Sequence, residues 1–176
     1  TSPNPHQKPH KPPLSGECVV PEGFGVIPHY LTYKRPEKIQ QGAIMKTIDE
    51  SRCPYTLSEI MLELLNKAIA LHPDASAITL NYRDPSHSVE SGGYHPVEIR
   101  INHRGEIQYI TDFTYYGAGP YAELGKEIDF DFSNDTFEHM SHLYPLEEGR
   151  ELFDVWQQNF TSYVAAGVFE CTVSPE

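Results

Sequence analysis

The sequence predicts an α+β fold in which two or three helices pack on one face of an antiparallel sheet of about four to six strands. Residues 97–115 alternate between apolar and polar side chains around a turn, which is typical of a β-hairpin. Two segments, near 56–71 and 145–166, carry apolar residues at helical spacing. The strands are grouped between these helices, and this order favours α+β over a parallel α/β fold.

The 176 residues are enough for one domain of ordinary size, and 39% of them are hydrophobic. Residues 1–15 are rich in Pro and His and have almost nothing to bury, so we expect them to form a flexible tail. Residues 16–176 are expected to form a single α+β domain. Within it, a short strand over 43–48 is the only element expected before the first helix.

The first helix is expected to start at Thr56. Thr56 and Glu59 have the spacing of a capping box, and Tyr55 and Ile60 are placed for a hydrophobic staple. The helix should end before Pro73, because the residue preceding a proline is pushed away from helical geometry. A strand over 78–82 follows.

The hairpin after this strand is the best-specified part of the chain. A three-residue loop, 103–105, with Gly105 in the left-handed conformation is a common hairpin connection. It pairs Ile101 with Ile107, Ile99 with Tyr109, Val97 with Thr111 and His95 with Phe113. The predicted core face is therefore Val97, Ile99, Ile101, Ile107, Tyr109 and Phe113, and the opposite face carries Glu98, Arg100, Ile110 and Asp112.

Four elements are expected after the hairpin. Residues 128–132 alternate and predict a strand, and a short helix is expected from Ser133 or Asp135 to His139. Pro145 opens a longer helix that Gly167 ends. Residues 168–173 alternate once more as a last strand.

The net charge of −12 is unevenly distributed. Residues 1–83 carry 9 basic and 8 acidic side chains, whereas residues 84–176 carry 4 and 17. An anionic surface repels phosphate, so we expect no direct binding to nucleic acid or to an anionic membrane. A protein partner fits this charge better.

Neither the cysteines nor the hydropathy indicates export. Cys18, Cys53 and Cys171 are isolated, and the chain has no CxxC pattern. Reduced thiols in a cytoplasmic protein are favoured over a disulfide between Cys18 and Cys53. No apolar run approaches the roughly 20 residues that span a bilayer.

Several separated blocks, in one order, resemble the bacterial family called domain of unknown function 2787. They are the strand before Arg83-Asp84-Pro85, residues 92–99 (GGYHPVEI), 109–113 (YITDF), 126–132 (KEIDFDF) and Trp156-Gln157. The resemblance covers residues 78–173. No activity is assigned to this family, so the resemblance identifies no catalytic residue. The resemblance implies a bacterial cytosolic protein that is encoded on mobile or accessory elements.

Two groups of residues could carry a function. Glu98, Asp112, Asp129 and Asp131 could gather as ligands of a divalent metal such as Mg²⁺ or Ca²⁺, although a solvated sheet face explains them more simply. The second group flanks one end of the hairpin, where glycines and tyrosines could frame an aromatic pocket or a protein-binding surface. Its members are Gly92, Gly93, Tyr94, His95, Tyr115, Tyr116, Gly117 and Tyr121.

The chain has no strained nucleophile turn, no HExxH and no phosphate-binding glycine motif. The predicted register points His95 toward the core, which favours a structural role over a catalytic one. We therefore expect a non-enzymatic binding module without a cofactor. The alternative is a metal-dependent hydrolase or small-ligand-binding enzyme that uses the clustered carboxylates or His95.

Overall fold

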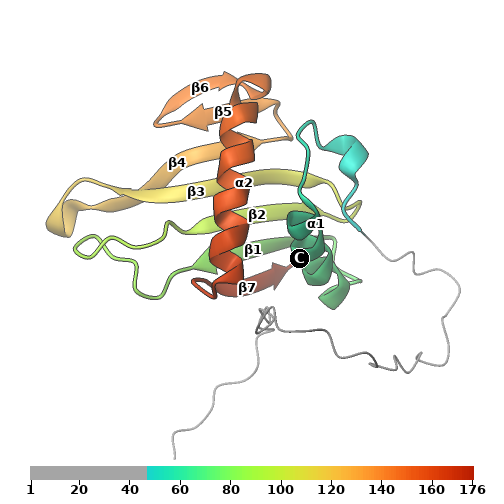
Figure 1. The fold of residues 1–176 in the computed structure, drawn as a ribbon, viewed down its shortest axis with the longest axis horizontal. Coiled ribbons are helices and arrows are strands. Elements are labelled where there is room, and N and C mark those ends of the chain that lie inside the picture. The colour runs from blue at the N-terminus through green and yellow to red at the C-terminus, as the bar shows by residue number, and fades with distance from the viewer. Residues whose placement is uncertain (1–46) are drawn as a thin grey trace, which may run out of the picture.

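The computed structural model describes residues 47–176 and shows a seven-stranded sheet crossed by helices (Figure 1). The expected tail over 1–15 and most of the expected strand over 43–48 lie outside these residues. All pairings are antiparallel, and the strand order is β6-β5-β4-β3-β2-β1-β7. The strands are β1 (Ala77–Arg83), β2 (Val97–Asn102), β3 (Ile107–Tyr116), β4 (Glu123–Asp131), β5 (Thr136–His139), β6 (His142–Pro145) and β7 (Glu170–Pro175). The α+β class is confirmed, but the predicted four to six strands were too few.

Two α-helices, α1 (Glu59–Leu71) and α2 (Arg150–Ala165), pack against one face of the sheet (Figure 1). Their buried side chains form one core with the side chains of that face, and Met61, Leu65 and Phe153 are completely buried in it. Three short 3₁₀ helices complete the described elements, at Glu50–Arg52 (η1), Gly119–Tyr121 (η2) and Leu146–Gly149 (η3).

Helix α1 starts two residues later than the capping-box pattern predicted. Ser58 is its N-cap, because the Ser58 side chain accepts a hydrogen bond from the backbone N–H of Met61 at 3.2 Å. The backbone N–H of Ser58 is in turn held by the side chain of Gln157 from α2 at 3.1 Å. Helix α1 ends at Leu71 with His72 as C-cap, as the following Pro73 predicted.

The predicted register of the β2–β3 hairpin holds only next to its turn. Gly105 has φ of +83°, and Ile101 lies opposite Ile107 as expected. A β-bulge follows, and Arg100 then lies opposite Tyr109 while Ile99 lies opposite Ile110. The extra residue in β3 exchanges the two faces beyond the bulge.

This exchange corrects the predicted faces of β3. Ile110 is completely buried in the core, and Tyr109 lies on the other face, where its hydroxyl donates to Glu98 at 2.7 Å. Asp112 lies opposite Val97 on the helix-covered side and accepts a hydrogen bond from Trp156 of α2. The expectation that Asp112 and Ile110 face away from the core was wrong.

The expected short helix over 133–139 is a strand. Its last four residues form β5, which pairs with β4 and then turns back into β6. Phe137 is buried and its ring stacks on that of Phe130 at 5.4 Å between centroids. The burial of this ring on the sheet outweighs the local signals for a helix cap.

Helix α2 agrees with its prediction. Pro145 precedes the 3₁₀ turn η3, which runs directly into α2. Phe153, Trp156 and Phe160 line its buried face, and Gly167 follows the helix with φ of +70°.

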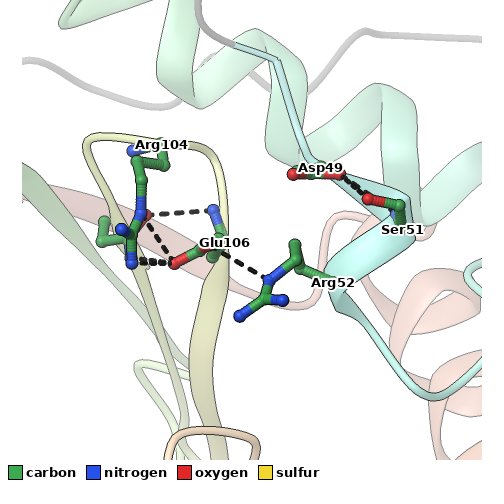
Figure 2. A network of polar contacts seen from close by, with 6 residues as sticks. Asp49, Ser51, Arg52, Arg104 and Glu106 are labelled. Atoms are coloured by element: carbon green, nitrogen blue, oxygen red, sulfur yellow. Dashed lines mark hydrogen bonds and ion pairs between the residues drawn. The ribbon is translucent and has the colours of Figure 1, made fainter.

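Residues 47–52 pack against the turn of the β2–β3 hairpin (Figure 2). The backbone N–H of Asp49 donates to the carbonyl oxygen of Gly105 at 2.9 Å. The carboxylate of Glu106 contacts the guanidinium groups of Arg104, at 2.8 Å, and Arg52, at 3.4 Å. Residues 47–52 are thereby attached to the end of the hairpin.

None of the helices among residues 47–176 is both long and apolar enough to cross a bilayer. Cys53 is partly buried and in no disulfide with another described residue. Cys18 lies outside the described residues, so the alternative of a disulfide with Cys53 stays untested.

Candidate functional site

A cavity of about 250 Å³ opens between helix α2 and the end of the sheet where β2 begins. The residues that form it come from the loop before β2, from the first residue of β2, from β3, from α2 and from the segment before β7. They are Gly93, Tyr94, His95, Val97, Asp112, Trp156, Asn159, Phe160, Tyr163 and Phe169. The predicted residues Gly93, Tyr94 and His95 therefore lie at a real cavity.

Aromatic rings make up most of the cavity wall. The ring of Tyr94 meets that of Tyr163 edge-on at 4.6 Å between centroids, and it lies 6.3 Å from Phe169. The rings of Trp156 and Phe160 stack at 5.0 Å, one turn apart on α2. Such walls suit an apolar or cationic group, because ring faces carry partial negative charge.

The loop that carries Tyr94 is fixed by Asp84. The Asp84 carboxylate accepts hydrogen bonds from the backbone N–H of Tyr94 at 3.0 Å and from the backbone N–H and hydroxyl of Ser86 at 2.8 and 2.7 Å. Gly93 is required beside this contact, since a Cβ atom there would lie 2.8 Å from the Asp84 carboxylate. The loop thus holds Tyr94 at the rim of the cavity.

This arrangement predicts a pH dependence. The hydrogen bonds from Tyr94 and Ser86 lower the pKa of Asp84 below its ordinary value. Because the folded-state pKa is the lower one, Asp84 stabilises the loop at neutral pH, and this contribution is lost as the pH falls below about 3.9. We expect the backbone amide resonance of Tyr94 to titrate in that acidic range in NMR spectra. The step should vanish in Asp84→Asn, and a midpoint above the ordinary range of aspartate would contradict the assignment.

One end of the cavity is polar, because His95 and Asp112 line it there and Glu127 contacts His95. The Nδ1 atom of His95 lies 2.7 Å from Oε2 of Glu127 and 3.2 Å from Oδ1 of Asp112. Their ligand atoms all lie within 4.8 Å of one another. The side chains keep 37%, 28% and 14% of their surface exposed, for His95, Glu127 and Asp112 respectively.

A second β-bulge brings Glu127 into this group. Asp112 lies opposite Ile128, but Phe113 lies opposite Lys126, so Glu127 is the extra residue in β4. The predicted strand over 128–132 did not include Glu127, and strict alternation along β4 would place it on the same face as Asp129, away from His95. The bulge turns its carboxylate toward His95 instead.

Neighbouring side chains contact the second carboxylate oxygen of Asp112 and the second ring nitrogen of His95. Nε1 of Trp156 donates to Oδ2 of Asp112 at 2.9 Å, and the hydroxyl of Thr114 lies 3.4 Å from Nε2 of His95. Burial raises the pKa of Asp112, and the hydrogen bond from Trp156 and the charge of His95 oppose this shift. Trp156 lies in the segment predicted as the helix over 145–166, and its contact with Asp112 was not predicted.

The four carboxylates expected to share a metal do not gather. Among residues 47–176, the His, Cys, Asp and Glu side chains close enough to share one ion are His95, Asp112 and Glu127. Glu98 accepts from Tyr109, Asp129 accepts from Thr111 and pairs with Lys126, and Asp131 accepts from the backbone N–H groups of Ser133 and Asn134. Only Asp112 of the predicted set belongs to the group, because Glu98 and Asp129 lie on the other face of the sheet.

The remaining predicted binding residues do not line the cavity. Tyr115 stacks on His87 at 5.1 Å, and the ring of His87 lies 5.8 Å from that of His95. The hydroxyl of Tyr116 donates to the carbonyl oxygen of Lys126 at 2.8 Å. Gly92, Gly117 and Tyr121 occupy the two loops, and Tyr121 is 86% exposed.

Two solved structures similar to this chain are proteins of Vibrio cholerae. A hypothetical protein from its VSP-II pathogenicity island is 29% identical with a TM-score of 0.66, and the alignment covers 74% of this chain and 99% of that one. A conserved hypothetical protein from pathogenicity island VPI-2 is 34% identical with a TM-score of 0.59, covering 68% and 95%. That second protein is described as sharing structural homology with the human P32 protein.

No curated protein shows significant sequence similarity to the chain. The family described as protein of unknown function (DUF2787) matches residues 55–174, which include the whole cavity and all seven strands but for the end of β7. The resemblance carried by GGYHPVEI, YITDF and KEIDFDF is thereby confirmed. The chain belongs to the DUF2787 family.

Proposed function

We propose that the protein is a small acidic, non-enzymatic module that binds another protein in the bacterial cytoplasm. The observation that carries this proposal is a group of exposed tyrosines around the cavity and on the neighbouring hairpin end. Tyrosine is enriched in protein interfaces because its ring provides rigid apolar area and its hydroxyl a polar contact.

We call this group the aromatic surface. Tyr94 and Tyr163 form it at the rim of the cavity, and the end of the β3–β4 hairpin, which projects beyond the rest of the sheet in Figure 1, carries the others. The stack of Tyr115 on His87, next to His95, connects the two parts. The members are Tyr94, Tyr115, Tyr116, Tyr121, Leu124 and Tyr163, each at least 36% exposed.

The charge supports a basic protein as the partner. The half of the sequence that provides the aromatic surface has 4 basic and 17 acidic side chains. Long-range attraction would speed encounter with a basic surface, and arginine side chains stack well on tyrosine rings. A partner that itself normally binds nucleic acid has such a surface, whereas nucleic acid would be repelled.

The genomic setting of the solved relatives is consistent with a role on bacterial accessory elements. Both Vibrio cholerae proteins are described as products of pathogenicity islands. A non-enzymatic role agrees with the absence of a nucleophile motif from the sequence.

The test is capture of a partner from a lysate of the host, at low and at physiological salt, followed by direct binding of the purified partner. We expect the variant carrying both Tyr94→Ala and Tyr121→Ala to bind at least about 10-fold more weakly in isothermal titration calorimetry. Leu143→Ala is the matched control, because Leu143 is 69% exposed but lies on β6, away from the aromatic surface. Failure to capture any protein above background, or equal binding by all variants, would refute the proposal.

A further inference from the structure

We propose that His95, Asp112 and Glu127 form a binding site for one divalent transition-metal ion, such as Mn²⁺, Fe²⁺, Co²⁺ or Zn²⁺. The three side chains come from the loop before β2, from β3 and from β4, and the fold brings their ligand atoms within 4.8 Å of one another. The proposal does not depend on protein binding by the aromatic surface. An ion here and a partner there can each be present without the other.

The distances agree with the edges of a metal coordination sphere. An ion about 2.1 Å from a histidine nitrogen and from two carboxylate oxygens has typical bond lengths for these ligands. At such an ion, the observed separations of 2.7 and 3.2 Å from Nδ1 of His95 correspond to angles of about 80° and 100°. These angles are close to the 90° of octahedral coordination. The remaining separation is that between the carboxylate oxygens of Asp112 and Glu127, and rotation of the Glu127 side chain can adjust it.

The ligand types select the class of ion. One imidazole nitrogen with two carboxylate oxygens suits Mn²⁺, Fe²⁺, Co²⁺ and Zn²⁺, whereas Mg²⁺ and Ca²⁺ prefer oxygen ligands alone. The site therefore differs from the oxygen-only set, Glu98, Asp112, Asp129 and Asp131, that the sequence suggested.

Groups outside the trio orient its members. Trp156 donates to Oδ2 of Asp112, which leaves Oδ1 directed at His95. Thr114 lies next to Nε2 of His95, so the Nδ1 edge of the ring faces the two carboxylates. Hydrogen bonds from such neighbours fix the direction of metal ligands and raise affinity.

The cavity provides room for further ligands. His95 and Asp112 both line the space of about 250 Å³, whose other walls are mainly aromatic. Water molecules, or a carboxylate or phosphate oxygen of a small ligand, could therefore complete the coordination of the ion. Three protein ligands next to an open cavity leave coordination positions free, whereas structural zinc sites are closed by four protein ligands.

A proton and a metal ion would compete for this position. Nδ1 of His95 has two carboxylate oxygens within 3.2 Å. Ligand atoms must be free of protons to bind an ion, so affinity should fall as the pH is lowered.

The experiment uses the full chain after treatment with EDTA and removal of the chelator. Titration with Mn²⁺ is followed by electron paramagnetic resonance, which reports the free ion, and titration with Co²⁺ by its visible absorption. We expect one ion per chain whose affinity falls by more than about 100-fold in both His95→Ala and Glu127→Gln. Glu98→Gln is the matched control, because Glu98 lies on the other face of the sheet and should leave binding unchanged.

Two controls make the result interpretable. The histidines of residues 1–46 are present in every variant, so any metal they hold contributes equally. Circular dichroism establishes whether each variant is folded, and Glu127→Gln should be folded because its side chain is 28% exposed and keeps its size. Wild-type binding no tighter than that of both variants would overturn the proposal, even where a protein partner is found.

Discussion

Replacement of Phe130 by alanine is expected to lower the free energy of unfolding by about 3–5 kcal/mol. Phe130 is completely buried in the centre of the sheet, and its ring contacts those of Tyr55, Phe137, Phe153 and Trp156. Truncation removes apolar contacts and leaves a cavity that the rings from β5, from α2 and from the segment before α1 cannot all move to fill.

Guanidinium denaturation followed by tryptophan fluorescence measures this change, because Trp156 is the single tryptophan of the chain. The matched control is Val155→Ala, since Val155 is 56% exposed on α2 and should alter stability by less than about 0.5 kcal/mol. A loss below about 1 kcal/mol for Phe130→Ala would mean that the aromatic core is not packed as described.

Gly105→Ala should destabilise the protein by more than about 2 kcal/mol, for two separable reasons. Gly105 has φ of +83°, which costs roughly 1–2 kcal/mol for a residue with a Cβ atom. In addition, that Cβ atom would lie 1.9 Å from the carbonyl oxygen of Thr47, so residues 47–49 would have to move off the hairpin.

Gly119→Ala separates the two reasons. Gly119 also has a positive φ, of +55°, but a Cβ atom there meets nothing within 4 Å. Comparison of the two free energies of unfolding therefore isolates the cost of the close approach to Thr47. Equal losses in both variants would show that residues 47–49 do not pack on the turn.

The sequence predicted those elements whose formation depends on residues close together in the chain. The stripe of Trp156 and Phe160 predicted α2, and the turn at Gly105 predicted the loop of the hairpin. The strand β5 was missed because the residues before it, Ser133 and Asp135, resemble helix caps, whereas the burial of Phe137 against Phe130 depends on distant parts of the chain.

The two β-bulges explain most of the differences between the predicted and the observed side-chain positions in the sheet. Tyr109 and Ile110 are both large and adjacent, so either could face the core, and the bulge next to Ile101 decides for Ile110. The bulge at Glu127 places its carboxylate beside His95. Strict alternation does not allow for an inserted residue, so it places Glu127 on the face opposite His95.

The two edges of the sheet limit how the protein can associate. The outer strands β6 and β7 are four and six residues long, and each ends in a proline, Pro145 and Pro175. A proline has no N–H to offer to an added strand, and short edge strands give little length for pairing. A second chain would therefore gain few hydrogen bonds by extending the sheet sideways. Contact through the rim of the cavity does not use the sheet edges, so it does not promote aggregation by strand pairing.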